Sequence, residues 1–134
     1  MCSMVLALPT KLRADIAVIV HPNNPVSQLT KKQISMLFLK QVKAYPQGRK
    51  VRPLNLHRKN PLSKSFYKNV VGKSGRRLSS YWAKILFSGK GTAPEEVRSS
   101  KEMLKKISED KQSIGYIDAA QVNERVKVIF LLAN

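Results

Sequence analysis

DIAVIVH, residues 15–21, is a β-branched apolar run near the start of the chain, and it predicts a buried strand. The run is closed by Pro22-Asn-Asn-Pro25, a cluster typical of a turn. The strand and its turn are the first structured part that the sequence predicts. Outward from it, helical and extended patterns alternate to the C-terminus.

Four helices are predicted from their start signals and apolar spacing. Two begin with capping boxes, Thr30-Lys-Lys-Gln33 and Ser99-Ser-Lys-Glu102, and we expect them to end near residues 43 and 110. A third begins at Asn60-Pro61, an N-cap followed by proline at the first helical position, and runs to about Gly72. The fourth covers residues 75–87 and stops at Gly89. Its wide apolar stripe consists of Leu78, Tyr81, Trp82, Ile85 and Leu86.

Three further strands are predicted over residues 51–56, 113–117 and 125–132. Pro53 indicates that the first of these is an edge strand or has an irregular start. Four strands interleaved with four helices predict an α/β fold with a mixed, mostly parallel sheet flanked by helices. The length of 134 residues and the hydrophobic content of 43% suit one globular domain, which we place at residues 15–134.

The charge is unevenly distributed along the chain. The net charge is +17, and from Ile16 to Pro94 there is no aspartate or glutamate, although this region holds sixteen lysines and arginines. Such an excess attracts phosphates, nucleic acids or anionic lipid surfaces. The composition therefore predicts an anionic partner.

Several classes of site are disfavoured by the composition. The single cysteine, Cys2, excludes an intrachain disulfide and a cysteine zinc site. His21 and His57 are isolated, and no pair of carboxylates or Ser-His-Asp set suggests catalysis. We therefore expect no enzyme activity, no metal and no cofactor.

The segment HRKNPLSKS, residues 57–65, places cations and hydroxyls around the start of the third helix. A helix N-terminus has unpaired N–H groups and a partial positive charge, and arginine binds phosphate through two hydrogen bonds. The alternative is an ordinary capped helix on a basic surface. The candidate anion-binding residues are Arg58, Asn60, Ser63, Lys64 and Ser65. A P-loop at residues 87–91 is excluded, because Gly91 and not Ser or Thr follows Lys90.

An ordered set of segments carries a family resemblance. The set is Ile16-Ala-Val-Ile-Val20, Ile34-Ser-Met-Leu-Phe-Leu-Lys40, Phe66-Tyr67, Tyr81-Trp-Ala-Lys-Ile-Leu-Phe-Ser-Gly-Lys-Gly91 with Pro94, and Ser113-Ile-Gly-Tyr116. It resembles the periplasmic phosphate-binding component of phosphate ABC transporters, most closely its short single-lobe relatives. The resemblance spans about residues 15–130. It implies one lobe of a type II periplasmic-binding-protein (Venus flytrap) fold and a non-enzymatic protein that binds phosphate or a related oxyanion.

The resemblance also concerns the site and the partners. In the full-length family two lobes grip the oxyanion, so a second copy or another protein would complete the site here. Arg58 matches the family's phosphate-binding arginine, whereas Leu62, Ser63 and Lys64 stand where the family has Ser-Gly-Thr. The implied partner is an ABC transporter permease, and the implied location is the periplasm. Residues 1–14 are then an N-terminal tail or the remnant of a truncated or atypical signal peptide.

A second interpretation remains open, that of a basic interaction module for nucleic acid or for a partner protein that supplies the missing lobe. Nucleic acid is less favoured, because the aromatic residues lie at core spacing on helices, whereas stacking platforms must be exposed. No apolar segment is long enough to span a membrane.

Overall fold

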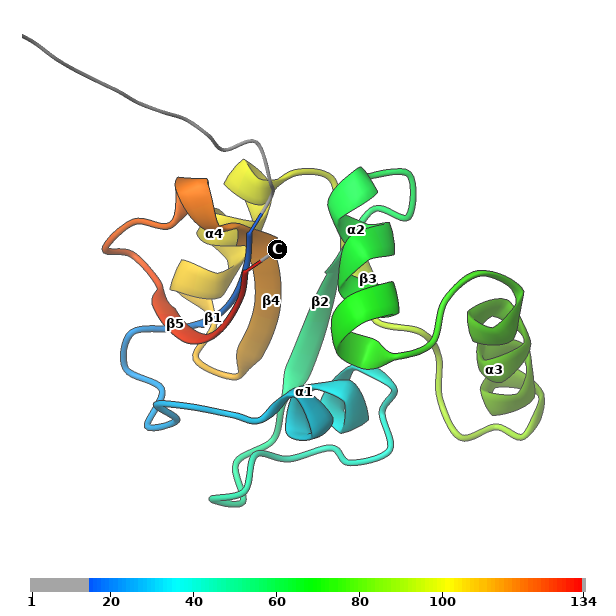
Figure 1. Ribbon diagram of the computed structural model, residues 1–134. Helices are drawn as coiled ribbons and strands as arrows, with labels where there is room; N and C mark the ends of the chain where they lie inside the picture. The colour runs from blue at the N-terminus through cyan, green and yellow to red at the C-terminus, as the bar shows by residue number, and fades with distance from the viewer. Residues whose placement is uncertain (1–14, 134) are drawn as a thin grey trace, which may run out of the picture.

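The structure, a computed structural model, describes residues 15–133, which form a five-stranded sheet with helices on both faces (Figure 1). The strand order is β3-β2-β4-β1-β5. The strands are β1 (Ile16–Val20), β2 (Arg52–Leu56), β3 (Glu95–Val97), β4 (Ser113–Asp118) and β5 (Lys127–Leu132). β2 pairs in parallel with β3 and β4, whereas β1 is antiparallel to β4 and β5. The predicted α/β class with a mixed sheet is confirmed, but the sheet is not mostly parallel, since two of its four pairings are antiparallel.

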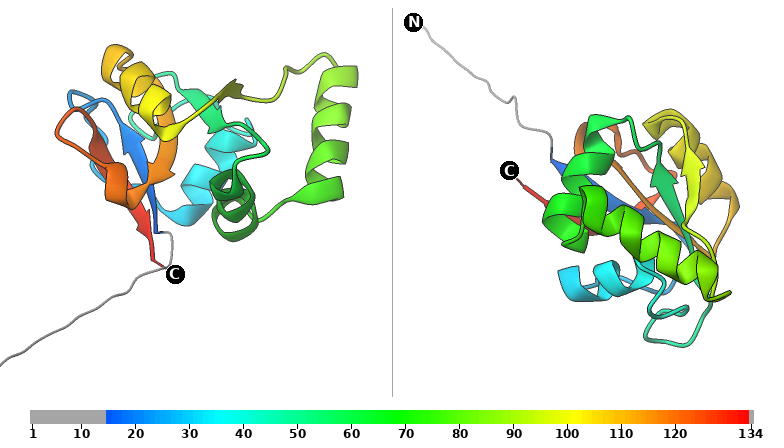
Figure 2. Two further views of the ribbon diagram at one scale, coloured as in Figure 1. Left: turned by 90° about the horizontal axis from the view of Figure 1, so that it is seen from above. Right: turned by 90° about the vertical axis from the view of Figure 1, so that its right-hand side faces the viewer.

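The helices form two layers. They are α1 (Lys31–Phe38), α2 (Pro61–Phe66) with its π-helical continuation η1 (Tyr67–Val71), α3 (Gly75–Phe87), α4 (Ser100–Glu109) and the short 3-10 turn η2 (Ala119–Gln121). α4 lies on one face of the sheet, and α1, α2 and η1 lie on the other (Figure 2, left). The candidate anion-binding residues at the start of α2 therefore lie on the face of the sheet that α1 and α2 cover.

All four predicted helix starts are correct. The Thr30–Gln33 capping box forms with both of its hydrogen bonds. At the start of α4, Ser99 accepts from the Glu102 N–H, but the Glu102 carboxylate accepts from Arg98 and not from Ser99, so only half of that box forms.

The end of α1 is earlier than predicted. The helix stops at Phe38 and not near residue 43, because Lys40 takes a left-handed conformation with φ 59°. The N–H groups of Gln41 and Val42 both donate to the carbonyl of Met36 and do not continue the helical ladder. A non-glycine residue at positive φ is set by its surroundings, and no local propensity predicts it.

One strand was not predicted. β3 has three residues, two of which are glutamates with exposed side chains, and it exists because its backbone pairs in parallel with β2. β2 is therefore an interior strand, and the edge interpretation of Pro53 is wrong. The irregular start is the correct alternative, since Arg52 and Pro53 pair only with β4 and the pairing with β3 begins at Leu54.

The core lies around β1, in which all five residues are buried, and β4 beside it. On the α1–α2 face, the Phe66 ring stacks on Tyr116 with centroids 3.8 Å apart and meets Phe38 edge-on at 4.8 Å. On the α4 face, Gly115 leaves room for Met103, because a Cβ added there would lie 2.5 Å from the Met103 sulfur. Neighbouring residues of a strand face opposite sides, so β4 serves both layers.

α3 has the predicted bounds but not the predicted place in the core. It stands off the rest of the fold (Figures 1 and 2), and none of its residues is buried. Leu86 is 59% exposed, and Phe87, just beyond the stripe, is 89% exposed. The inner side of α3 is anchored by Tyr81, whose hydroxyl donates to the Leu39 carbonyl at 2.7 Å.

Two further predictions concern the N-terminal segment and membrane-spanning helices. The predicted tail or signal remnant, residues 1–14, lies outside the described residues. Within residues 15–133, no helix is long and apolar enough to cross a bilayer.

Candidate anion-binding site

The candidate site begins where β2 leaves the sheet. Leu56 is fully buried, and the chain then turns so that the Asn60 N–H donates to the His57 carbonyl at 2.8 Å. The His57 Nδ1 accepts from the Lys59 N–H at 3.1 Å, which tightens the turn. Arg58 lies at the exposed tip between these bonded residues. These bonds fix the backbone of the turn that carries Arg58.

Arg58 faces a hollow of about 430 Å³ between α2, the start of α3 and the segment before β3. Three of the five predicted residues line it, namely Arg58, Ser63 and Lys64. Two do not. Asn60 is occupied as the cap of α2, with its Oδ1 accepting from the Leu62 N–H at 2.9 Å, and the Ser65 hydroxyl lies within hydrogen-bond distance of the Asn69 side chain.

The start of α2 does not have the free N–H groups that the sequence suggested. The Leu62 N–H is bonded to the Asn60 side chain, and the Ser63 N–H is bonded to the Asn60 carbonyl at 2.9 Å. Pro61 has no N–H at all. The backbone of this helix start therefore contributes little to anion binding, and the side chains of the site must do more.

The start of α3 supplies what α2 lacks. Ser74 is its N-cap and Gly75 its first residue, and both line the hollow. The Ser74 side chain makes no capping bond, and the first N–H to bond back along the helix is that of Leu78. The N–H groups of residues 75–77 therefore have no partner in the helix, and the positive end of a 13-residue helix lies at the hollow.

The floor of the hollow is made of buried polar groups. Asn55, Ser63 and Tyr67 are 9%, 4% and 3% exposed, and all three line it. Asn55 is held in place by the Tyr116 hydroxyl, which donates to its Oδ1 and accepts from the Leu56 N–H. A polar floor below a cationic rim is an arrangement that suits an oxyanion.

Tyr67 is the exceptional member of this floor. Its hydroxyl is buried and has no hydrogen-bond partner among residues 15–133. Burial raises the pKa of Tyr67 well above the ordinary value of 10.0, and the nearby Asn55 amide offsets this only in part. The neutral hydroxyl is thus a donor without an acceptor, a situation that typically costs about 1–3 kcal/mol.

The charges around the hollow favour a small anion. Arg58 and Lys64 lie on it together with the carboxylate of Glu96, whose Oε1 is 3.9 Å from the His57 Nε2. Among the described residues, no group of three or more His, Cys, Asp and Glu side chains lies together as a metal site would require.

Three residues that line the hollow, Tyr67, Ser74 and Gly75, were not identified from the sequence. The Ser-Gly pair before Arg76 was nevertheless a visible helix-start signal.

Comparison with solved structures identifies the fold. The chain is similar to an ABC-type phosphate transport receptor from Vibrio cholerae, with 20% sequence identity and a TM-score of 0.69 over 87% of this chain and 46% of that one. The chain folds as one lobe of such a receptor. No family model matches this lobe, and no curated protein matches it.

Two further receptors agree with this assignment of the fold. A putative phosphate ABC transporter substrate-binding protein with bound phosphate from Clostridium perfringens has 19% identity and a TM-score of 0.67, over 87% of this lobe and 45% of that chain. PstS from Borrelia burgdorferi has 17% identity and a TM-score of 0.63, over 87% and 47%. The lobe thus spans less than half the length of the receptors it matches. The single-lobe architecture expected from the sequence is confirmed at the level of the fold.

Proposed function

We propose that the protein is a non-enzymatic binding protein that holds inorganic phosphate or a related oxyanion in the hollow between α2 and α3. The observation that carries this proposal is Tyr67, which lines a hollow rimmed by Arg58 and Lys64 and whose buried hydroxyl has no hydrogen-bond partner among the described residues. An oxyanion is the acceptor that this donor lacks. The similarity of the fold to receptors described as phosphate-binding supports the same ligand.

Each group has a distinct role in the proposed complex. Arg58 binds two oxygens at once, because its guanidinium presents parallel N–H donors, and Lys64 contributes a point charge. The hydroxyls of Ser63 and Tyr67 donate from the floor. The N–H groups at the start of α3 complete the shell, as helix N-termini do for phosphate.

Glu96 should make the proposed site prefer phosphate to sulfate. A carboxylate only accepts hydrogen bonds, so it favours an anion that still carries a proton. Phosphate keeps a proton at neutral pH and sulfate does not. We therefore expect phosphate to bind more tightly than sulfate.

The proposal extends to location and partners. A protein of this kind acts in the periplasm as the substrate-binding component of a phosphate ABC transporter, with the permease as its partner and residues 1–14 as a tail or signal remnant. The proposal includes a second lobe, from a second copy or from another protein, that closes the open side of the hollow. In two-lobed receptors this closure is the signal to the permease.

The experiment compares two neighbouring cations. Phosphate and sulfate are titrated into the protein by calorimetry and by NMR, and then into Arg58→Ala and Lys59→Ala. Lys59 is the control because it is exposed, lies in the same turn and does not line the hollow. Loss of Arg58 should weaken phosphate binding about tenfold or more, as expected for hydrogen bonds to a charged group. Equal effects of the two variants, or the absence of saturable shifts over residues 58–67, would contradict the proposal.

A basic interaction module is the second candidate, and one observation favours it. A shallow cationic surface at α3 and the segment before it is lined by Lys73, Arg76, Arg77 and Lys84. Binding of nucleic acid there would weaken steeply with rising salt and show little sequence preference. An affinity for oligonucleotides that is insensitive to salt, or that survives neutralisation of Arg76 and Arg77, would contradict this candidate.

A further inference from the structure

A second hollow, larger than the candidate site, lies beyond the end of α1. Its volume is about 580 Å³, and it is enclosed by the end of α1, the segment that leads into β2 and residues 90–93. The cations that line it are Lys40, Lys43, Lys50, Arg52 and Lys90. Glu95 is the one carboxylate among its lining residues. We call it the lysine hollow.

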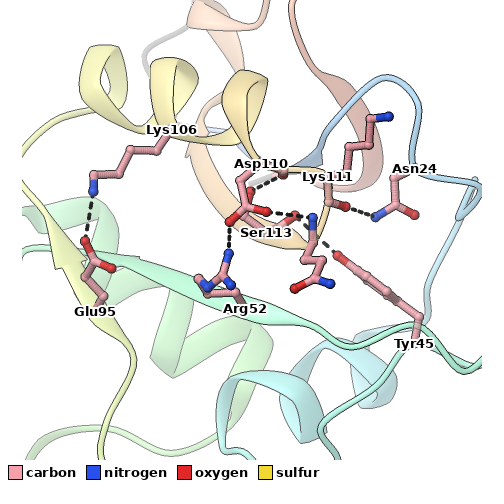
Figure 3. A network of polar contacts seen from close by, with 9 residues as sticks. Asn24, Tyr45, Arg52, Glu95, Lys106, Asp110, Lys111 and Ser113 are labelled. Carbon is pink, nitrogen blue, oxygen red and sulfur yellow. Dashed lines mark hydrogen bonds and ion pairs between the residues drawn. The ribbon is translucent and has the colours of Figure 1, made fainter.

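The carboxylate and the arginine of the hollow are each paired with a residue outside it. Figure 3 shows the Glu95 carboxylate turned toward Lys106 of α4, with which it forms an ion pair at 2.9 Å. Arg52 is paired with Asp110 near the centre of the same view. The four lysines of the hollow therefore have no carboxylate partner among residues 15–133.

The path of the backbone brings these lysines close to one another. The Val51 N–H donates to the Lys43 carbonyl at 3.0 Å, and Ala44 forms an antiparallel bridge with Lys50, so Lys43 and Lys50 flank one narrow hairpin. Lys40 is held at φ 59° beside them. Burial, followed by the charge of Lys43, lowers the pKa of Lys40, as expected where like charges are close and not neutralised.

The lysine hollow is distinct from the site of the proposed function. Glu95 lines the lysine hollow and Glu96 lines the candidate site, because successive residues of β3 point to opposite faces of the strand. Ala93 lies on both hollows. The two sites are therefore neighbours on either side of residues 93–96, and each is open to a separate test.

We propose that the lysine hollow binds a linear oligophosphate of three or more phosphate groups. The four lysines without a carboxylate partner exceed the charge of one phosphate, which is about −2 at neutral pH. A volume of 580 Å³ lies within the range of small-molecule sites, about 300–1,000 Å³. Lysine ammonium groups act as mobile point charges and lack the bidentate geometry of arginine, so they suit a chain of equivalent anionic groups.

The walls of the hollow disfavour a nucleic acid as the occupant. Its apolar lining is aliphatic, with Leu37, Val42, Val51, Pro53 and Ala93. No aromatic residue lines it, so a base would find no ring on which to stack. The chemistry that remains is that of the phosphate groups alone.

The test uses the full chain and sodium tripolyphosphate in about 0.15 M salt, where unspecific surface attraction is screened. Calorimetry and NMR are applied to the protein, to a Lys43→Gln, Lys90→Gln variant and to a Lys101→Gln, Lys105→Gln control. The control pair is exposed on α4, lies outside the hollow and removes the same charge. All four lysines are exposed, so the fold is expected to tolerate both variants.

We expect the hollow variant to bind tripolyphosphate about tenfold or more weakly and the control to stay within about twofold. Binding of single phosphate, measured in parallel, should be the same in both variants, because the site at Arg58 is separate. Equal weakening in the two pairs would overturn the proposal, since it would reflect net charge alone. It would also be overturned if a single-stranded oligonucleotide of equal charge bound more tightly and shifted the same lysines.

Discussion

Replacing Tyr67 by phenylalanine should change stability and phosphate binding in opposite directions. In the ligand-free protein the Tyr67 hydroxyl is buried without a partner among the described residues, which typically costs about 1–3 kcal/mol. Removal of the oxygen relieves that cost and leaves a small gap, so we expect Tyr67→Phe to raise the free energy of unfolding by about 1 kcal/mol. For a chain of this length the midpoint of thermal unfolding should rise by about 3–5 °C.

The same substitution removes a donor from the proposed phosphate shell. A hydrogen bond to a charged group is worth about 1.5–3 kcal/mol, so phosphate should bind about tenfold to a hundredfold more weakly. Bound ligand stabilises the folded state by an amount that grows with the logarithm of the ratio of ligand concentration to Kd. The variant, with its larger Kd, gains less from this, so its advantage should disappear in excess phosphate. Thermal and denaturant unfolding, with and without phosphate, together with calorimetric titration, measure both effects.

Tyr116→Phe is the matched control for this experiment. Its hydroxyl donates to Asn55 and accepts from the Leu56 N–H, so its loss should destabilise the ligand-free protein by about 1–3 kcal/mol. If Tyr67→Phe destabilises the ligand-free protein as Tyr116→Phe does, the Tyr67 hydroxyl is already bonded in the folded state. An unchanged phosphate affinity would likewise refute the role assigned to Tyr67.

Three further outcomes follow from the packing. Gly115→Ala should destabilise the protein by about 1–3 kcal/mol in urea unfolding, because the new Cβ would lie 2.5 Å from the Met103 sulfur. Met103 is itself fully buried, so Met103→Ala is also destabilising, and the cost of the double variant should be smaller than the sum of the two single costs. Phe87→Ser should change the free energy of unfolding by less than about 0.5 kcal/mol, since Phe87 is 89% exposed. Replacement of the fully buried Phe66 by alanine should cost about 3–5 kcal/mol. Similar losses for the two variants would place Phe87 in the core. Stability followed against pH should be level up to about pH 9 and fall above the ordinary tyrosine pKa of 10.0, by about 1.4 kcal/mol per pH unit for each buried tyrosine. The sign follows because burial raises these pKa values in the folded state, so the unfolded chain loses its phenolic protons first; a level profile to pH 11 would contradict this. The tyrosines concerned are Tyr45, Tyr67 and Tyr116.

Part of the candidate site was predictable from the sequence. Arg58, Ser63 and Lys64 lie within a few residues of each other, and the Asn60-Pro61 helix start that positions them is a local signal. The structure brings these three to one hollow. Asn60 was also identified, but its side chain caps α2 by accepting from the Leu62 N–H. A sequence alone does not show whether such a side chain bonds to its own helix or to a ligand.

The sequence by itself determined the elements whose causes are local. The β-branched run of residues 16–20, the Thr30 capping box and the glycine stop at residue 89 each act within a few positions, so each could be read without the fold. It also determined that the cations between residues 16 and 94 would lack acidic neighbours along the chain.

Only the tertiary structure decided which of these residues meet. β3 exists through its pairing with β2, and the apolar stripe of α3 stays partly in water because the chain carries that helix off the sheet. The start of α3 lines the same hollow as Arg58, and Lys90 lines the same hollow as Lys43, although many residues separate them along the chain. Both encounters depend on the path of the backbone, which is set by the packing of the whole core and not by any short pattern of residues.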